Sequence, residues 1–297
     1  MSDRPAWIAL SVSDPAEAEL VERGLSSTHL DLAFIELARH LLATGHNLAY
    51  GGDLRLRGFT EQLLDLVRSY HLPGAPPAPV AVDDDQGAPA DAEASKRIRN
   101  YLVAPLYDAT APEQLAAARN VADIRRMEIP REEIPHPVRG DHKAEQALML
   151  SEMRQVVTDE SRAGIVLGGK LTGSSGRAPG VLEEAWYSVK DGQPLFVLGG
   201  FGGIGSLIAD RLAGRDTGDR EAKIAADEGF TEMGGRLEGV MPEELPRDGS
   251  TMLAEIVAGG IEGLHNGLSV DDNRHLFETD DIDVAIALVL RGLYALE

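Results

Sequence analysis

The sequence predicts an α/β protein: a Rossmann-like, doubly wound and mostly parallel sheet with a helical extension at its C-terminal end. Short apolar runs end in glycine or small polar residues, and segments with helical periodicity follow them, which is the pattern of repeated strand-to-helix units. The 32 glycines in 297 residues suit a fold with many tight turns. With 43% hydrophobic residues, the chain has the material for a sizeable core.

The first half of the chain alternates between predicted strands and helices. A strand over residues 7–10 leads into small polar residues, and apolar residues then recur at helical spacing over 30–43, where Gly45 is predicted to end the helix. Residues 72–95 are rich in proline, alanine and aspartate and predict a mobile loop, and three prolines make residues 130–140 irregular. The other predicted elements are a strand over 46–50, a helix over 60–70, a strand over 80–82, a strand over 98–104, a helix over 112–120 and a strand over 122–129.

The second half contains two consecutive strand-to-helix steps and then a helical region. The steps are a helix over 144–158, a strand over 164–167, a helix over 180–190, a strand over 194–198 and a helix that follows glycines and ends near 212. Residues 219–247 are polar and suggest no element, while helices are predicted over 251–261 and 282–294. We therefore expect a nucleotide-binding domain over 1–212, and a C-terminal helical extension over 213–297 that packs on it.

Charge and composition exclude several classes of function. The formal net charge of −21 argues against nucleic acid and against an anionic membrane as partners, since both are bound mainly through lysine and arginine. The chain has no cysteine, which excludes disulfides and thiolate metal sites. No apolar run reaches the roughly 18 residues of a membrane span, and the histidines show no metal-ligand spacing. We expect a cytoplasmic protein with neither a bound metal nor a cofactor.

Small or glycine-rich turns follow four of the predicted strands. The carboxyl ends of parallel strands share one edge of the sheet, and the helix N-termini there present free N–H groups, so we expect these turns to bind a phosphate or carboxylate. A P-loop is absent, and residues 200–205 only imitate the dinucleotide-binding spacing, so neither an NTPase nor a hydride-transfer enzyme is favoured. The candidate ligand-binding residues are Ser11 and Ser13; Gly51, Gly52 and Asp53; Gly168, Gly169, Lys170, Gly180 and Val181; and Gly200, Phe201, Gly202 and Gly203.

Three stretches, residues 50–60, 168–185 and 194–203, resemble the SLOG superfamily, and they add Gly58, Phe59 and Thr60 to the candidate ligand-binding residues. That superfamily unites the Lonely Guy phosphoribohydrolases, the DNA-processing protein DprA, the ligand-sensing region of TRPM channels and sensor domains of bacterial antiviral systems such as Thoeris. The resemblance spans residues 5–212 and is greatest to the sensor-type branch associated with TIR and Thoeris proteins. It implies a nucleotide-derived ligand such as ADP-ribose or a cyclic ADP-ribose-like signal. It also implies a homo-oligomer, dimer or tetramer, that acts with a separate effector protein in antiviral defence or stress signalling.

The same resemblance also implies an alternative, enzymatic function. In the phosphoribohydrolases a Pro-Gly-Gly-x-Gly-Thr-x-x-Glu loop holds the phosphate, and its glutamate works with an upstream arginine at the glycosidic bond. Here these positions are similar to Glu184 and Arg154, but a nine-residue insertion follows Gly169 and Val181 stands where the threonine would be. The alternative function is therefore an N-glycosidase acting on nucleoside monophosphates.

The same residues can also be explained without any ligand. A glutamate in the first turn of a helix favours the helix dipole without any ligand, and a helix arginine is usually a surface group. Lys170 and Arg177 lie in the insertion, where they either close over an anionic ligand or are simply solvated. A structural partner protein with a vestigial pocket is the third possibility.

Overall fold

A computed structural model describes residues 7–69, 96–241, 246 and 248–297 of the chain. Most of the predicted loop at 72–95, together with the strand predicted at 80–82, lies outside the described residues. Within the part that is described, no helix is both long and apolar enough to cross a membrane.

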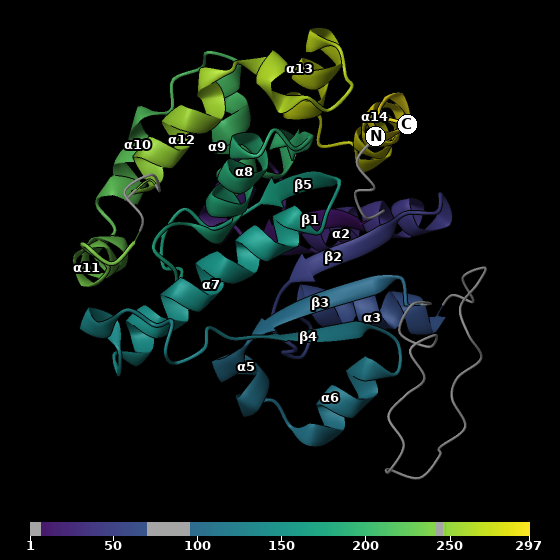
Figure 1. The fold of residues 1–297 in the computed structure, drawn as a ribbon. Helices are drawn as coiled ribbons and strands as arrows, with labels where there is room; N and C mark the ends of the chain where they lie inside the picture. Colours follow the sequence, from purple (N-terminus) through teal and green to yellow (C-terminus); the bar gives the residue numbers. More distant parts are fainter. Residues whose placement is uncertain (1–6, 70–95, 242–245, 247) are drawn as a thin grey trace.

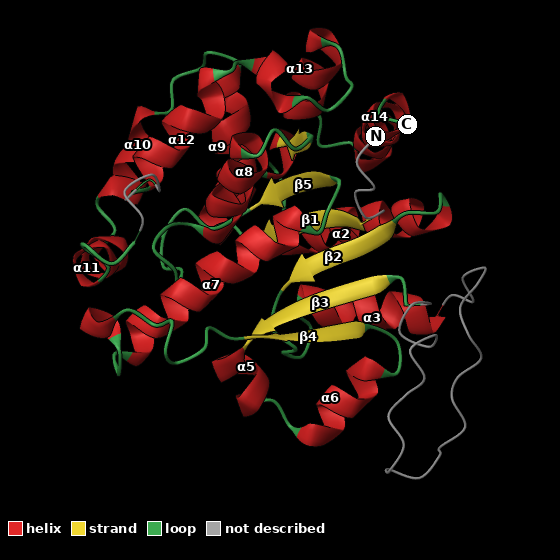
Figure 2. Ribbon diagram, viewed as in Figure 1, coloured by secondary structure: helices red, strands yellow, loops and turns green. Residues whose placement is uncertain are grey.

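The described strands form one parallel sheet, which confirms the predicted Rossmann-like α/β class (Figure 1 and Figure 2). The strands are β1 Trp7–Ser13, β2 Asn47–Gly51, β3 Ile98–Val103, β4 Asp123–Met127, β5 Ala163–Gly168 and β6 Leu195–Leu198. Their order in the sheet is β4-β3-β2-β1-β5-β6. The chain therefore builds outward from β1 to β4 and then returns to the other side of β1, so the strand order reverses between β1 and β5. In such sheets ligands enter at this reversal, outside the carboxyl ends of the strands.

Helices cover both faces of the sheet and extend beyond it. The predicted helix at 180–190 is found with those bounds, and the others agree within a few residues. The polar stretch 219–247, which suggested no element, contains two short helices, and three further short helices had no clear sequence signal. The helices are α1 Glu17–Glu22, α2 Ser27–Ala43, α3 Phe59–Ser69, α5 Ala104–Ala109, α6 Pro112–Arg119, α7 His142–Asp159, α8 Gly180–Lys190, α9 Gly203–Leu212, α10 Gly218–Ala225, α11 Glu228–Arg236, α12 Gly249–Ala258, α13 Val270–Glu278 and α14 Ile282–Ala295.

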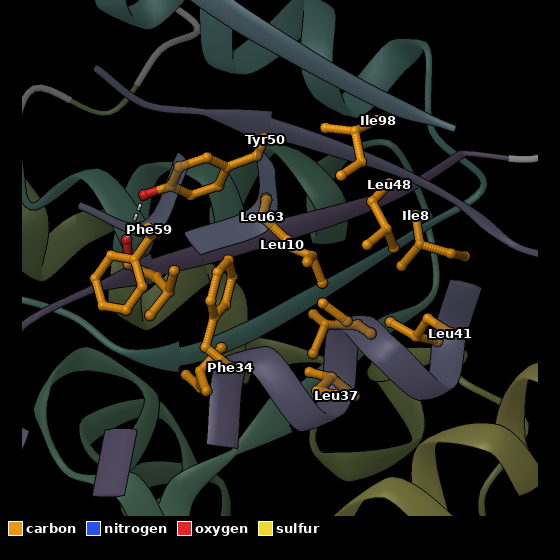
Figure 3. Packing of buried hydrophobic residues seen from close by; sticks show 14 of the residues in the cluster. Ile8, Leu10, Phe34, Leu37, Leu41, Leu48, Tyr50, Phe59, Leu63 and Ile98 are labelled. Atoms are coloured by element: carbon orange, nitrogen blue, oxygen red, sulfur yellow. Dashed lines mark hydrogen bonds between the residues drawn. The ribbon is translucent and has the colours of Figure 1, made fainter. Parts of the chain in front are cut away.

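The largest core cluster joins one face of the sheet to α2 and α3. Apolar residues of α2 recur every three or four positions, so that one stripe of this helix faces the strands. Gly45 adopts a φ of +98° just past the end of α2, as expected for the residue that ends a helix. Figure 3 shows the resulting contact, in which Phe34, Leu37 and Leu41 of α2 lie beneath Ile8 and Leu10 of β1.

The opposite face of the sheet packs against α7 and α8. Met149 and Met153 of α7 contact Ala49 of β2 and Tyr101 of β3. The next cluster joins α8 to β5, β6 and the C-terminal helix α12. This layer matters for function because α7 and α8 cross the sheet near the carboxyl ends of its central strands (Figure 1).

The glycine run after β6 serves packing between distant segments. A Cβ added at Gly200 would lie 1.9 Å from the carbonyl oxygen of Thr279, and one added at Gly199 would lie 2.3 Å from that of Phe277. Both contacts are with backbone atoms, in the last turn of α13 and just after it, and backbone cannot yield as a flexible side chain can. Only glycine lets the C-terminal segment approach the end of β6 this closely.

Gly200→Ala should therefore lower the free energy of unfolding by about 2 kcal/mol, since overpacking of this kind costs roughly 1–3 kcal/mol. The matched control is Gly234→Ala on α11, where an added Cβ meets nothing within 4 Å and alanine should stabilise the helix by roughly 0.5–1 kcal/mol. Urea denaturation of both variants measures the two changes. If both variants were stabilised, Gly200 would have no packing role.

Candidate functional site

A cavity of about 260 Å³ opens at the carboxyl edge of the sheet, and we call it the edge cavity. The ends of β1, β2 and β3, the residues after β5, and helices α5, α7 and α8 line it. Its position beside the reversal of strand order is the one expected for a ligand site in a parallel sheet. The predicted residues that line it are Ser13, Gly51, Gly52, Asp53, Phe59, Arg154, Lys170, Gly180, Val181 and Glu184.

Glu184, on the first turns of α8, borders the edge cavity with a side chain that is 18% exposed. Burial raises the pKa of its carboxyl to about 7 from an ordinary 4.5, against the opposing influence of Arg154 and of the Ser11 hydroxyl, while the neighbouring Glu183 carboxylate adds to the rise. Ser11 lies below Glu184, beside a small void of about 10 Å³, and does not line the edge cavity. Glu184 can therefore exchange a proton near neutral pH at the cavity wall.

Glu183, the preceding residue, has no exposed surface, and the pKa of its carboxyl shifts in the opposite direction to that of Glu184. It accepts hydrogen bonds from Ser151 Oγ at 2.6 Å, from Arg177 Nε at 2.7 Å and from Arg154 Nη1. Burial alone would raise the pKa of its carboxyl, but the two guanidinium groups and the Ser151 hydroxyl together lower the pKa below the ordinary value. Glu183 is thus an anchor whose carboxyl is ionised at neutral pH.

Arg154 connects this anchor to the cavity. The side chain is 9% exposed, its Nη1 binds Glu183, and its Nε lies 3.8 Å from Glu184 Oε1. That Nε is buried and has no hydrogen-bond partner, although buried donors are nearly always paired. A Cβ at Gly180 would lie 2.7 Å from Arg154 Nη2, so glycine at the start of α8 makes room for the guanidinium. One interpretation of the sequence was that Arg154 is an ordinary surface arginine. The structure excludes this interpretation because Arg154 is buried.

Hydrogen bonds of the buried Asn100 side chain hold the turn after β2. Asn100 Nδ2 donates to the Gly52 carbonyl oxygen at 2.9 Å, and Asn100 Oδ1 accepts from the Thr60 hydroxyl at 3.2 Å. A Cβ at Gly52 would lie 2.2 Å from the Tyr50 ring. Thr60 therefore supports this turn from a buried position, and Gly58 lies behind Arg55, so neither residue lines the cavity.

Ser13 shapes the other side of the cavity, at the end of β1. Its carbonyl oxygen accepts from the Gly169 N–H at 2.6 Å and its Oγ from the Lys170 N–H at 3.1 Å. Gly168 and Gly169 have φ values of +62° and +103°, which glycine adopts without strain. These two glycines turn the chain away from β5, and they lie behind the cavity rather than in its wall.

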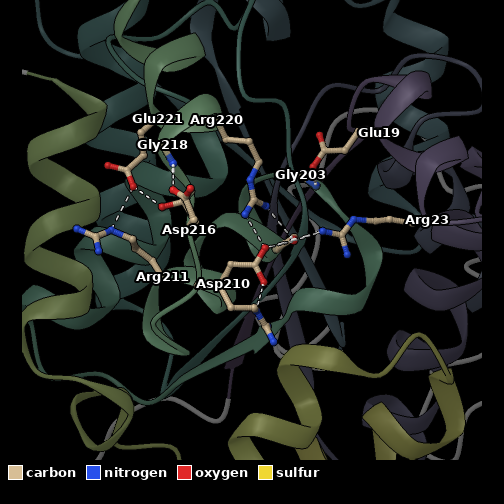
Figure 4. A network of polar contacts seen from close by, with 12 residues as sticks. Glu19, Arg23, Gly203, Asp210, Arg211, Asp216, Gly218, Arg220 and Glu221 are labelled. Atoms are coloured by element: carbon tan, nitrogen blue, oxygen red, sulfur yellow. Dashed lines mark hydrogen bonds and ion pairs between the residues drawn. The ribbon is translucent and has the colours of Figure 1, made fainter.

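The turn at residues 200–203 lies outside the edge cavity. The Gly203 N–H, at the start of α9, donates to Glu19 Oε1 at 2.8 Å, so a carboxylate of the chain itself already meets that helix N-terminus. Figure 4 shows Glu19 there beside a network in which Asp210 pairs with Arg220 at 2.5 Å. Gly200, Phe201, Gly202 and Gly203 thus do not line the cavity, although Gly203 packs against the backbone of Gly168 and Gly169.

Arg177 also differs in position from the expectation that it closes over a ligand. Its side chain is 2% exposed and lies under the cavity, where Nε binds Glu183 and Nη1 donates to the Pro246 carbonyl oxygen. It reaches the cavity only indirectly, because Glu183 holds both Arg177 and Arg154.

Several residues of the cavity wall were missed by the sequence reasoning. An apolar wall comes from the end of β3 and from α5 and α7, and it includes Leu102, Leu106 and Met153. These residues form ordinary apolar patterns in the sequence, so only the fold reveals them. The other unpredicted lining residues are Val12, Tyr50, Arg55, Tyr101, Val103, Leu150, Gly173, Ser174 and Ser175.

The charges around the edge cavity favour an anionic ligand. The side chains of Arg55, Arg154 and Lys170 line it, against the carboxyl groups of Asp53 and Glu184. This is a local surplus of positive charge in a chain whose net charge is −21. In the described parts of the chain, no group of three or more histidine, aspartate or glutamate residues is arranged to hold a metal ion.

Comparison with known proteins gives one family. The sequence profile of the family described as SLOG cluster2 matches residues 3–276. No curated protein matches the chain. The match runs past residue 212 without a break, and the predicted division of the chain there stays a prediction.

Glu183→Gln should lower the free energy of unfolding by roughly 3–5 kcal/mol, because it leaves two buried guanidinium groups without their anion. Glu36→Gln on α2 is the control, since it weakens an ion pair whose partners are each 35% exposed, which costs less than about 1 kcal/mol. Urea denaturation at pH 7 compares them. Similar losses in the two variants would contradict the anchoring role of Glu183.

Glu184→Gln should increase stability at high pH more than at low pH. A carboxyl with a raised pKa contributes stability that is complete below about pH 4.5 and is lost as the pH rises through about 7. Glutamine carries no charge to bury, so the variant should gain about 2 kcal/mol over the wild type between pH 5 and pH 8. Thermal unfolding across this range measures the difference, and a constant difference would show that the Glu184 pKa is not raised.

Proposed function

The chain belongs to the SLOG cluster2 family, and from this premise we propose that its edge cavity binds a nucleotide-derived ligand as a sensor. ADP-ribose and cyclic ADP-ribose-like molecules are the leading candidates. Membership of the SLOG family is consistent with nucleotide-related binding or with a glycosidase-like function. The choice of sensing over catalysis rests on Val181 and on the insertion between Gly169 and Pro179.

One observation carries the proposal: Arg154 lines the edge cavity, and its buried Nε has no hydrogen-bond partner. Leaving a buried donor unpaired costs roughly 1–3 kcal/mol, and more for a charged group. A phosphate or ribose oxygen that meets the guanidinium after a small shift of this side chain would supply the missing acceptor. Glu184, 3.8 Å away, would accept from a ribose hydroxyl when ionised, or donate to a phosphate oxygen when protonated.

The walls of the cavity indicate how such a ligand lies. Arg154, Lys170 and Glu184 give the cavity a polar part, whereas β3 and α5 contribute the apolar residues Leu102 and Leu106. An anionic group then belongs in the polar part, and a flat base belongs against the apolar wall.

The size of the cavity limits how much of the ligand it encloses. Its volume of about 260 Å³ is just below the roughly 300–1,000 Å³ of usual ligand pockets. It suits one nucleoside-sized portion, so a larger ligand would extend past the rim. Arg55, with a side chain 60% exposed, lies in the cavity wall near Asp53 and is placed to meet that outer part.

A second candidate, an N-glycosidase acting on nucleoside monophosphates, is favoured by the pKa of about 7 at Glu184. A carboxylate of that pKa in a cavity can activate water at neutral pH and stabilise an oxocarbenium-like ribose. Two features favour the sensor instead. Val181 supplies no hydroxyl for a phosphate, and nine residues separate Gly169 from Pro179.

The wider role proposed here is a homo-oligomeric sensor in bacterial antiviral defence or stress signalling that acts with a separate effector protein. It rests on the resemblance to the branch associated with TIR and Thoeris proteins. Cytoplasmic location belongs to the same proposal.

Binding is tested by thermal shift and calorimetry with AMP, NAD, ADP-ribose and cyclic ADP-ribose isomers, with base release followed by chromatography in the same samples. A ligand present at 100 times its Kd should stabilise the protein by about 2.7 kcal/mol, a shift of several degrees. Stabilisation without base release supports the sensor. Base release that disappears in Glu184→Gln would establish the glycosidase, and no shift with any nucleotide would contradict both functions.

Arg55→Ala should weaken binding of ADP-ribose about fivefold to tenfold, because it removes a cation from the cavity wall. Arg57→Ala is the matched control, since Arg57 carries the same charge in the same turn and does not line the cavity. Calorimetry should show a change of less than twofold for the control. Equal losses in both variants would mean that only the overall charge of the turn matters.

A further inference from the structure

The nine residues inserted between Gly169 and Pro179, residues 170–178, form what we call the inserted loop. Lys170, Gly173, Ser174 and Ser175 of this loop line the edge cavity. The Ser174 hydroxyl donates to the Ala178 carbonyl oxygen at 3.1 Å, which is a contact within the loop itself. Other segments also hold the loop: its Lys170 N–H donates to Ser13 Oγ of β1 at 3.1 Å, and two further contacts come from the C-terminal region.

Asp227 makes the first of these contacts. Its Oδ2 accepts from the Gly173 N–H at 2.9 Å, and its Oδ1 caps α11 by accepting from the Phe230 N–H at 2.9 Å. One carboxylate thus serves two separate hydrogen bonds, one to the wall of the cavity and one to a C-terminal helix.

Helix α11, which follows Asp227, is held in place by α7. Met233 and Leu237, in and after α11, pack with Ala144 and Ala147 of α7, and Arg236 pairs with Asp141 at the start of α7. Helix α7 in turn lines the edge cavity through Leu150 and Met153. The inserted loop is thus bonded to Asp227 before α11, α11 packs on α7, and both the loop and α7 line the cavity.

Arg177 makes the second contact at the far end of the loop. Its Nη1 donates to the Pro246 carbonyl oxygen, and its Nε binds the Glu183 carboxylate that also holds Arg154. The C-terminal region thus touches the inserted loop near its middle, at Gly173, and near its end, at Arg177. The contact at Arg177 leads through Glu183 to Arg154.

We propose that Asp227 and Arg177 are positioning residues of the edge cavity, through which its affinity for ligand depends on the C-terminal helices. The proposal rests on the proposed function, because it concerns the same cavity. If the loop's contacts with α11 raise the affinity of the cavity for a ligand by a given factor, then by linkage the bound ligand stabilises those contacts by the same factor. The C-terminal region is then where an effector would read the occupancy of the cavity.

Asp227→Asn separates the two roles of this carboxylate. Asparagine caps a helix as well as aspartate does, so the bond to the Phe230 N–H is retained. The second oxygen, however, becomes an NH₂ group, which cannot accept from the Gly173 N–H. The matched control is Asp248→Asn, because Asp248 caps α12 through the Thr251 N–H at 2.8 Å and does not line the cavity.

Hydrogen exchange tests the loop contact without any ligand. In Asp227→Asn the Gly173 amide should exchange at least fivefold faster than in the wild type and in Asp248→Asn, while the thermal midpoint changes no more than in that control. Unchanged exchange at Gly173 would overturn the positioning role, whether or not any nucleotide binds.

Calorimetry with ADP-ribose tests the consequence for the cavity. Asp227→Asn should bind about fivefold to tenfold more weakly than the wild type, as expected for the loss of one hydrogen bond, and Asp248→Asn should bind unchanged. Equal affinity in all three proteins would overturn the proposal. A wild type that binds no nucleotide would instead contradict the proposed function, and the exchange result would still decide whether Asp227 positions the loop.

Discussion

The buried carboxylate of Glu183 is the interaction on which the candidate site depends. It brings together Arg154 and Ser151 from α7 and Arg177 from the inserted loop, and it belongs to α8 itself. A buried charge is stable only when it is paired and hydrogen-bonded, so these segments must meet in this arrangement. Because Arg154 is held in this way, its side chain borders the cavity while its buried Nε has no hydrogen-bond partner.

Two adjacent glutamates acquire opposite properties from this arrangement. Glu183 has two guanidinium partners and a lowered pKa. Glu184 is partly buried and lies 3.8 Å from an arginine already paired elsewhere, and its pKa is about 7. Environments that separate the pKa values of neighbouring carboxyl groups are typical of functional sites. Structural and ligand-facing roles are thus divided between consecutive residues of one helix.

The sequence could predict the fold and the location of the cavity, because both follow from local patterns. Strand ends, helical periodicity and glycine turns are visible in the chain, and parallel strands must bring their carboxyl ends to one edge. Individual roles were less predictable, because they depend on contacts between distant segments. Gly200 looked like a phosphate-binding glycine, yet it makes room for Thr279, and Arg177 looked like a loop cation, yet it is buried against Glu183. The apolar wall with Met153 required the fold itself.

The most direct test is a crystal structure of the protein with bound ADP-ribose. The proposed site predicts that the ligand lies in the edge cavity, with an oxygen within hydrogen-bond distance of Arg154 Nε and a second contact to Glu184. A ligand found at the turn after β6, beside Gly203 and Glu19, or anywhere that leaves Arg154 Nε without a partner, would contradict it.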